Sequence, residues 1–238
     1  MKKIILIVSF LSLSLGLYSN ASAKKYAEEL CELESYECIK IESGDTWEKL
    51  WPDEEQRDVV RRANRMNIRL QNGMTIAVPK NLPSLSIYDV APFPRYIDSH
   101  GEKVIFVSQT KLAWGAYDEE GELVWWGPIS SGKDYCGGVG KSCKTPGGSY
   151  RIFRRQGVGC VSTAFPRRRS GRNGGSRMPY CMHYYRGYAL HGFAIVPGER
   201  ASHGCVRLFP EDAKWLNQDF IALPKGDYRG TKLIIEDI

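Results

Sequence analysis

Cys205 and two histidines are the residues of this chain best suited to nucleophilic chemistry. Cys205 lies in the run Ser202-His203-Gly204-Cys205, and His191 precedes that run by a short gap. A cysteine attacks a carbonyl as its thiolate, so it needs a nearby base and amide groups that hold the oxyanion. On an extended segment His203 would share a face with Cys205, and His191 could reach it from another strand. The alternative is that Cys205 is a small core residue and both histidines are structural.

Two neighbours of the cysteine bear on its geometry. Gly204 permits a backbone conformation that most residues refuse, which could turn amide N–H groups toward a substrate carbonyl. Arg207, two residues beyond Cys205, could bind a substrate carboxylate or hold the nucleophile loop through backbone carbonyls.

The pattern around these residues resembles the signature of the L,D-transpeptidases, bacterial enzymes that remodel peptidoglycan. That signature is His-Gly, a short gap, and then Ser-His-Gly-Cys followed by a hydrophobic residue and Arg or Asn. Further matches precede it in order, and they are Ser131-Gly132-Lys133, residues 145–152, Met178-Pro179-Tyr180 and residues 187–192. The resemblance covers residues 95–238, and it implies a catalytic domain there.

The resemblance implies a role for each residue of the motif. Cys205 would be the acylated nucleophile and His191 the general base, oriented through the backbone carbonyl of Gly192. His203 would support the site, and amides near Gly204 and Cys205 would form the oxyanion hole. The candidate substrate-binding residues are Ser202, Arg207, Tyr180 and Tyr188, and packing in the core is the alternative for the two tyrosines.

The gap between His191 and Ser202 is shorter than the family pattern. Residues 197–200, Pro-Gly-Glu-Arg, lie within it and predict a compact hairpin. The substrate contacts that longer insertions make in the family therefore cannot be carried over to this chain.

The N-terminus has the pattern of a secretory signal. Lys2 and Lys3 form a basic region, residues 4–17 an apolar stretch, and Asn20-Ala21-Ser22-Ala23 a small-residue cleavage site. The apolar stretch is shorter than the ~20 residues of a spanning helix, and an uncleaved anchor is the alternative. We expect a signal peptide over residues 1–23, no further membrane span, and an exported protein of the periplasm or cell wall. Export argues against nucleic acid as the partner of the net charge of +6.

The chain has seven cysteines, so one must stay unpaired or pair between chains. The motif assigns that position to Cys205. The most economical pairing of the others joins 31 to 38, 136 to 143 and 160 to 181, although six cysteines can pair in many ways and buried free thiols are an alternative. No Cys-x-x-Cys spacing occurs, so we expect no metal and no cofactor, and a thiol oxidoreductase is disfavoured.

Patterning predicts a mainly β catalytic domain. Short strand-like runs separated by turn signals occur at residues 103–107, 123–126, 150–153 and 232–235. Pro210 and the acidic residues after it predict a helix over residues 210–220, which would buttress the nucleophile loop. For residues 95–238 the resemblance implies the β-sandwich-like L,D-transpeptidase fold with one or two helices.

Residues 24–80 predict a small α+β domain. We expect a strand at 38–41, a short helix capped by Asp45 or Ser43, a helix at 53–66 and a strand at 73–79. This order, with Gly44-Asp45-Thr46 and the closing Gly-x-x-Ile-x-Val-Pro, resembles a LysM module, which binds glycan strands of peptidoglycan. A packing domain without a ligand is the alternative. Residues 81–94 contain several prolines and predict a semi-rigid linker.

The resemblance implies a reaction on peptidoglycan stem peptides. The Cys205 thiolate would attack the third residue of a tetrapeptide stem, expel the terminal D-alanine and form a thioester. A stem amine, a lysine of an envelope lipoprotein or water would then resolve it, and water would make the enzyme an L,D-carboxypeptidase. A non-catalytic wall-binding protein is the competing class. Arginines between residues 167 and 177 could capture acidic peptides or form a solvated surface.

Overall fold

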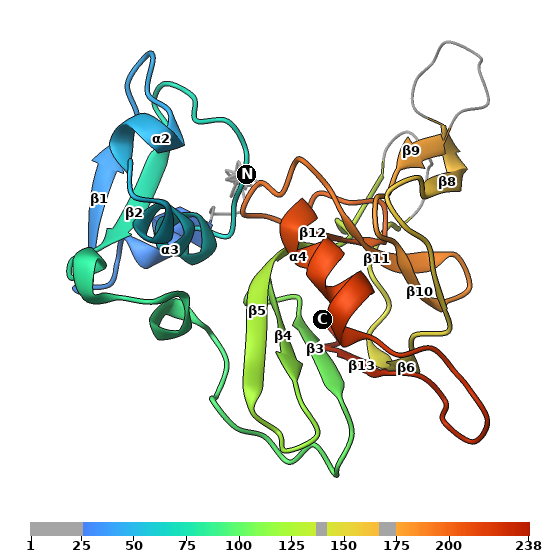
Figure 1. Cartoon of the computed structure of the whole chain (residues 1–238). Coiled ribbons are helices and arrows are strands. Elements are labelled where there is room, and N and C mark those ends of the chain that lie inside the picture. Colours follow the sequence, from blue (N-terminus) through green and yellow to red (C-terminus); the bar gives the residue numbers. More distant parts are fainter. Residues whose placement is uncertain (1–25, 137–141, 167–174) are drawn as a thin grey trace, which may run out of the picture.

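The computed structural model describes residues 26–136, 142–166 and 175–238, which form an N-terminal unit and a larger β domain (Figure 1). The signal sequence that we expect at residues 1–23 lies outside the described residues. The N-terminal unit contains α1 (Tyr26–Leu30), β1 (Tyr36–Lys40), α2 (Trp47–Leu50), α3 (Glu54–Ala63) and β2 (Thr75–Pro79). β1 and β2 pair antiparallel, with Cys38 opposite Ala77. The predicted order of strand, two helices and strand is confirmed.

The helix ends of this unit differ from the prediction. Thr46, rather than Asp45 or Ser43, caps α2, because its side chain accepts a hydrogen bond from the Lys49 amide. Asp45 instead accepts hydrogen bonds from the Glu42 amide and the Lys49 ammonium.

The second helix is also shorter than predicted. Asp53 caps the start of α3 by accepting a hydrogen bond from the Gln56 amide. α3 stops at Ala63 instead of Met66, because Arg65 adopts a φ of 57°, which cannot continue a right-handed helix.

The predicted linker region forms two 3-10 turns, η1 (Leu82–Ser84) and η2 (Ile87–Val90). The turns are held against the β domain by two hydrogen bonds. The Trp126 indole donates to the Ile87 carbonyl, and the Tyr88 hydroxyl donates to the Val124 carbonyl, both at 2.8 Å. Residues 81–94 are therefore packed between the two parts of the molecule.

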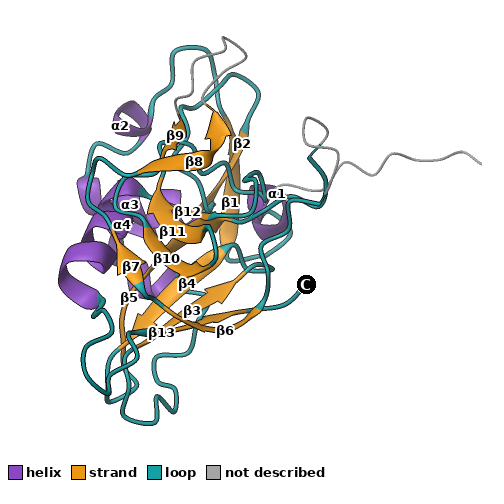
Figure 2. Cartoon of the chain, turned by 90° about the vertical axis from the view of Figure 1, so that its right-hand side faces the viewer, coloured by secondary structure: helices purple, strands orange, loops and turns teal. Residues whose placement is uncertain are grey.

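The β domain is built on one curled nine-stranded sheet (Figure 2). Its strands, in spatial order, are β6 (Gly148–Arg151), β13 (Lys232–Ile235), β3 (Val104–Ser108), β4 (Ala113–Tyr117), β5 (Leu123–Ser130), β12 (Val206–Leu208), β11 (Tyr188–Gly192), β10 (Met182–Tyr185) and β7 (Arg154–Arg155). A separate hairpin is formed by β8 (Val161–Pro166) and β9 (Gly175–Arg177). The mainly β prediction is confirmed, with strands at each of the four predicted runs.

The connection that follows the His191 strand is not the compact hairpin that we predicted. β11 and β12 are parallel, with Leu190 opposite Val206 and His191 opposite Arg207. Two parallel neighbours cannot be joined by a tight turn, so residues 193–205 must leave the end of β11 and return to the start of β12. We call residues 193–198 the crossover segment.

The predicted C-terminal helix is present as α4 (Pro210–Trp215), which continues as a π-helical turn (Leu216–Phe220). α4 packs directly on β11 at Gly192. A side chain there would bring its first carbon within 3.1 Å of the Pro210 Cα and 3.3 Å of the Ala213 methyl. The close approach favours glycine, and it places the end of the His191 strand directly against the helix.

All three predicted disulfides are confirmed. They join Cys31 to Cys38, Cys136 to Cys143 and Cys160 to Cys181. Cys205 is the free cysteine. Each bridge restricts the unfolded chain, and bridges of this kind typically contribute about 2–4 kcal/mol to stability.

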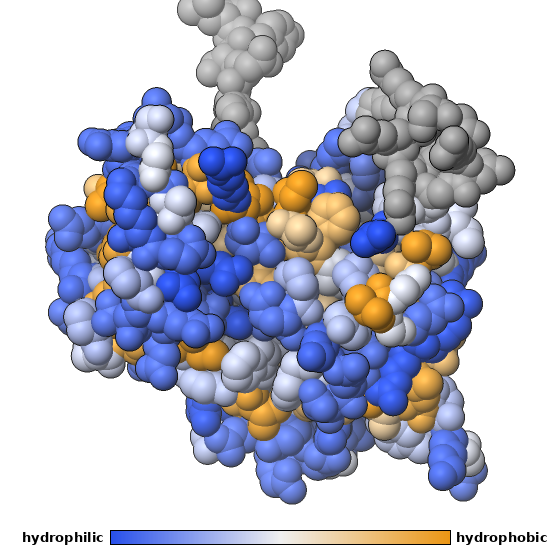
Figure 3. Space-filling model, turned by 45° about the horizontal axis from the view of Figure 1, so that its top comes forward, coloured by the Kyte–Doolittle hydropathy of each residue, from blue (hydrophilic) through white to orange (hydrophobic). Residues whose placement is uncertain are grey.

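Hydrophilic residues cover most of the face shown in Figure 3, and the apolar residues on it gather in small patches. Among the described residues no helix is long and apolar enough to cross a membrane. The same residues contain no cluster of three or more histidine, cysteine or carboxylate side chains that could hold a metal ion.

Candidate active site

The loop before Cys205 is closed by hydrogen bonds to the buried Ser202 hydroxyl. This hydroxyl donates to the Cys205 carbonyl at 2.5 Å and accepts from the Gly204 amide at 3.0 Å. The oxyanion role implied for the Gly204 amide is therefore not available in this conformation, because that amide already has an acceptor. Ser202 shapes the nucleophile loop from within.

Gly204 is required by both its conformation and its surroundings. Its φ is +116°, a value that side-chain-bearing residues rarely adopt. An added Cβ would also lie 2.7 Å from the Tyr188 ring. Tyr188 thus packs beneath the nucleophile loop.

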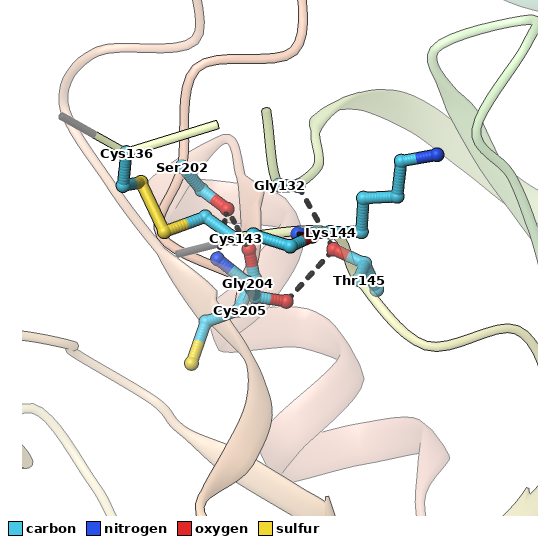
Figure 4. The surroundings of a disulfide bond; sticks show 9 residues. Gly132, Cys136, Cys143, Lys144, Thr145, Ser202, Gly204 and Cys205 are labelled. Carbon is cyan, nitrogen blue, oxygen red and sulfur yellow. Dashed lines mark hydrogen bonds between the residues drawn. A yellow bond between two sulfur atoms is a disulfide. The ribbon is translucent and has the colours of Figure 1, made fainter. Parts of the chain in front are cut away.

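Thr145 ties the loop to a second segment of the domain (Figure 4). Its buried hydroxyl donates to the Gly204 carbonyl at 2.7 Å and accepts from the Gly132 amide at 2.8 Å. Gly132 lies so close to the Cys143 carbonyl that a Cβ would come within 1.8 Å of that oxygen. The Cys136–Cys143 disulfide lies in the chain between Gly132 and Thr145, the two residues joined by this hydroxyl.

Replacing Thr145 with valine is expected to lower stability by about 1–3 kcal/mol, because it leaves the buried Gly204 carbonyl and Gly132 amide without this partner. Thr145→Ser keeps the hydroxyl and is the matched control. Thermal unfolding of both variants measures the difference. Equal unfolding temperatures would show that Thr145 does not hold the loop through its hydroxyl.

His191 is fixed in one orientation by its own strand. It is buried, and its Nδ1 lies 3.0 Å from the Gly192 carbonyl oxygen. A carbonyl can only accept, so Nδ1 carries the proton and Nε2 is the free base of the neutral ring. Burial lowers the pKa of His191 to about 4, with the charge of Arg207 acting in the same direction. The imidazole is therefore neutral at physiological pH.

The parallel register brings three reactive side chains to one face of the sheet. His191 is opposite Arg207, and Cys205 lies two residues before Arg207. All three line one pocket, whose residues are Ser162, Ser176, Met178, His191, Phe193, Ser202, His203, Cys205 and Arg207.

Cys205 is protonated at rest. Burial raises the pKa of its thiol, and the Ala189 amide and the Arg207 charge offset only part of this effect. A neutral imidazole that lines the same pocket as a neutral thiol suits general-base activation, in which proton removal accompanies attack.

Arg207 contacts the crossover segment. Its guanidinium lies over the Phe193 ring, 4.4 Å from the centroid, and donates toward the Ile195 carbonyl at 3.5 Å. The guanidinium also faces the pocket, where a carboxylate could reach it.

The other predicted site residues divide into two groups. Ser202 and His203 line the pocket, with His203 in an exposed position. Tyr180 and Tyr188 are absent from its lining and pack against the main hydrophobic core. The structure thus gives the two tyrosines a packing role and supplies no substrate contact for them. Arg167, Arg168, Arg169 and Arg172 lie outside the described residues.

Two residues of the site were not assigned a role from the sequence. Thr145 begins the family match at residues 145–152, yet nothing in the sequence shows that its hydroxyl reaches Gly204. Phe193 follows His191-Gly192, and its ring meets the imidazole edge-on, with centroids 6.0 Å apart. Its position directly after the histidine motif was the only available signal.

Comparison with solved structures finds the same fold in a bacterial relative. An L,D-transpeptidase fragment from Xylanimonas cellulosilytica has a TM-score of 0.51 and 20% identity, and the match covers 75% of this chain and 78% of that one. L,D-transpeptidase 3 from Mycobacterium tuberculosis, solved with a faropenem-derived adduct, gives a TM-score of 0.43 and 21% identity. That match covers 57% of this chain and 60% of the other, so the chain spans less than two thirds of that relative.

Among curated proteins none matches this chain. The model of the YkuD family, the L,D-transpeptidase catalytic domain, matches residues 102–232, which is more than half of the chain and includes Thr145, His191 and Cys205. The chain belongs to the L,D-transpeptidase catalytic domain family.

Proposed function

We propose that this protein is a peptidoglycan L,D-transpeptidase that uses Cys205 as its nucleophile and His191 as its general base. The observation that carries the proposal is the hydrogen bond from His191 Nδ1 to the Gly192 carbonyl. It leaves Nε2 as the base of a histidine that lines the same pocket as the free thiol.

The reaction is an acyl transfer in two halves. Cys205 Sγ attacks the carbonyl of the third residue of a tetrapeptide stem while His191 Nε2 takes the thiol proton. The tetrahedral intermediate collapses as His191 returns this proton to the departing amine of D-alanine, which leaves a thioester on Cys205. An acceptor amine then attacks the thioester, His191 removes the amine proton, and the thiol is regenerated.

Incubation with purified tetrapeptide muropeptides, followed by mass spectrometry, tests this proposal. Crosslinked dimers support transfer to a stem amine, whereas tripeptides alone support the alternative, an L,D-carboxypeptidase that uses water. Transfer to a lysine of an envelope lipoprotein is tested by adding such a lysine peptide as acceptor. No acyl transfer or hydrolysis of any stem would refute the enzymatic proposal.

The pH dependence of the reaction follows from the electrostatics of the base. Because the pKa of His191 is lowered to about 4, the base stays unprotonated well below its usual range. Activity should therefore be lost only as the pH falls toward about 4, and kcat/KM at pH 5.5 should stay within about twofold of its value at pH 7. An acid limb with an apparent pKa between 6 and 7 would contradict this prediction.

We also propose that the N-terminal unit is a LysM-like module that binds glycan strands, and that the protein is exported to the periplasm or cell wall. The order β1, α2, α3, β2 and the antiparallel pairing of its strands support the first proposal. The three disulfides support the second, because such bonds persist in oxidising compartments. Sedimentation with purified peptidoglycan, with and without competing glycan oligomers, tests the binding.

A further inference from the structure

Asn67 of the N-terminal unit hydrogen-bonds to the crossover segment through both its side chain and its backbone. The Asn67 Oδ1 accepts a hydrogen bond from the Val196 amide at 2.8 Å, and its own backbone amide donates to the Val196 carbonyl at 3.0 Å. The Asn67 Nδ2 donates to the Phe193 carbonyl at 3.4 Å. Asn67 therefore holds the backbone of the crossover segment at two points.

The same segment reaches directly into the catalytic pocket. Phe193 lies edge-on to the His191 ring, and the Arg207 guanidinium lies over its face. Arg207 also donates toward the Ile195 carbonyl. A shift of the crossover segment would therefore move Phe193, which packs against His191, and Arg207, which lines the pocket.

The chain around Asn67 is itself firmly placed. The buried Asn64 side chain donates to the Val60 and Ala77 carbonyls and accepts from the Ala77 amide. Gly198, with a φ of +75°, lies so close to this turn that a Cβ would meet the Asn64 carbonyl oxygen at 3.0 Å. The crossover segment thus rests on a rigid part of the N-terminal unit.

The contact between the two parts of the molecule does not depend on Asn67 alone. The buried Arg65 side chain donates to the Lys111 carbonyl of the β domain at 3.0 Å. The backbones of Met66 and Pro197 form an isolated antiparallel β-bridge. Removing the Asn67 side chain should therefore loosen the crossover segment while the two parts stay docked.

We propose that Asn67 is a positioning residue for acyl transfer, which acts by holding the crossover segment so that Phe193 fixes the orientation of His191 and Arg207 in the pocket. The N-terminal unit would then be a structural part of the active site as well as a separate binding module. This inference rests on the function proposed above.

The test compares Asn67→Ala, Asn67→Asp and Asn81→Ala in the full-length protein. Asn81 is an exposed asparagine of the same half of the chain, and its side chain makes no capping hydrogen bond, so Asn81→Ala is the matched control. Asn67→Ala is expected to lower kcat on the order of 10-fold with KM nearly unchanged, because misplaced catalytic groups slow the reaction more than binding. Asn67→Asp keeps the acceptor for the Val196 amide and should retain most of the activity.

Two measurements accompany the kinetics. Amide hydrogen exchange at Val196 reports whether the crossover segment has loosened, and it should be faster in Asn67→Ala than in Asn81→Ala. The rate of Cys205 alkylation by iodoacetamide, measured against pH, reports on the thiol and its neighbours without any peptidoglycan substrate. We expect the alkylation profile of Asn67→Ala to shift, because the Arg207 charge lowers the pKa of the Cys205 thiol and His191 is its proposed base.

The inference is overturned if kcat and the alkylation profile of Asn67→Ala coincide with those of Asn81→Ala. If the unaltered protein transfers no acyl group, the proposed function fails, and the alkylation profiles and exchange rates alone decide the role of Asn67. If Asn67→Ala does not fold, Asn67→Leu carries the same comparison, because it keeps the side-chain volume and removes both side-chain hydrogen bonds. Faster exchange at Val196 together with a shifted alkylation profile would then support the positioning role, and exchange and alkylation equal to those of Asn81→Ala would refute it.

Discussion

Replacing Cys205 with alanine is expected to abolish both crosslinked and hydrolysed products, because no other free thiol lies in the pocket formed by the described residues. His191→Ala keeps the nucleophile and removes the base. The thiol of Cys205 has a raised pKa, so the thiolate is scarce at neutral pH without that base. General-base assistance typically contributes about 10²–10⁴-fold, and we expect kcat/KM to fall by this factor. Product formation from tetrapeptide muropeptides, followed by mass spectrometry, measures both effects.

The matched control for the base is His203→Ala. Both histidines line the pocket, but His191 is buried with its Nδ1 held by the Gly192 carbonyl, whereas His203 is exposed. We therefore expect His203→Ala to retain far more activity than His191→Ala. The assignment of the base is contradicted if His203→Ala loses as much activity as His191→Ala, or if His191→Ala keeps the rate of the unaltered protein at neutral pH.

Local sequence patterns were enough to predict much of the catalytic domain. The strand at residues 232–235 and the helix that starts at Pro210 were predicted because period and capping residues are local properties. Each of the three disulfides joins two cysteines that follow one another along the sequence, so the simplest pairing was also the correct one. The family motif located His191 and Cys205, which the structure brings to a single pocket.

Contacts between residues far apart in the sequence could not be predicted from local patterns. The gap between His191 and Ser202 was interpreted as a hairpin, because a short proline-glycine segment is typical of tight turns. Strand direction follows from pairing across the whole sheet. β12 runs antiparallel to β5 and parallel to β11, and the parallel pair makes the connection a crossover. The Asn67 contacts with Val196 had no signal in the sequence, since a single asparagine beyond a helix end normally indicates only a turn.

Arg62 is the clearest case of a residue whose role required the structure. It lies on the apolar face of α3, and its guanidinium donates two hydrogen bonds to Asp212 of α4, at 2.9 and 3.0 Å. It also donates to the Trp126 carbonyl at 2.7 Å, and the Trp125 indole donates to the same Asp212 carboxylate. Arg62 and Asp212 are both almost fully buried, at 1% exposed. This ion pair joins the N-terminal unit to the helix that supports the His191 strand.

Arg62→Met is expected to destabilise the protein by about 3–5 kcal/mol, because it leaves the Asp212 carboxylate buried without its cation. Burial alone would lower the pKa of Arg62, but the charges of Asp212 and Asp58 hold it above its usual value, so the guanidinium is charged throughout the accessible pH range. The matched control is Arg61→Met on the same helix. Arg61 lies 3.5 Å from Glu211, whose side chain is 52% exposed, and such pairs contribute only about 0–1 kcal/mol.

Urea unfolding of the two single variants and of the double variant Arg62→Met with Asp212→Leu measures these energies. Replacing both partners of a buried ion pair with apolar residues is often close to neutral, so the double variant should recover much of the stability lost in Arg62→Met. That recovery would show that the loss comes from the unpaired carboxylate rather than from missing side-chain volume. Equal midpoints for Arg62→Met and Arg61→Met would contradict the prediction, since the buried and the exposed pair would then contribute alike to the docking of α3 on α4.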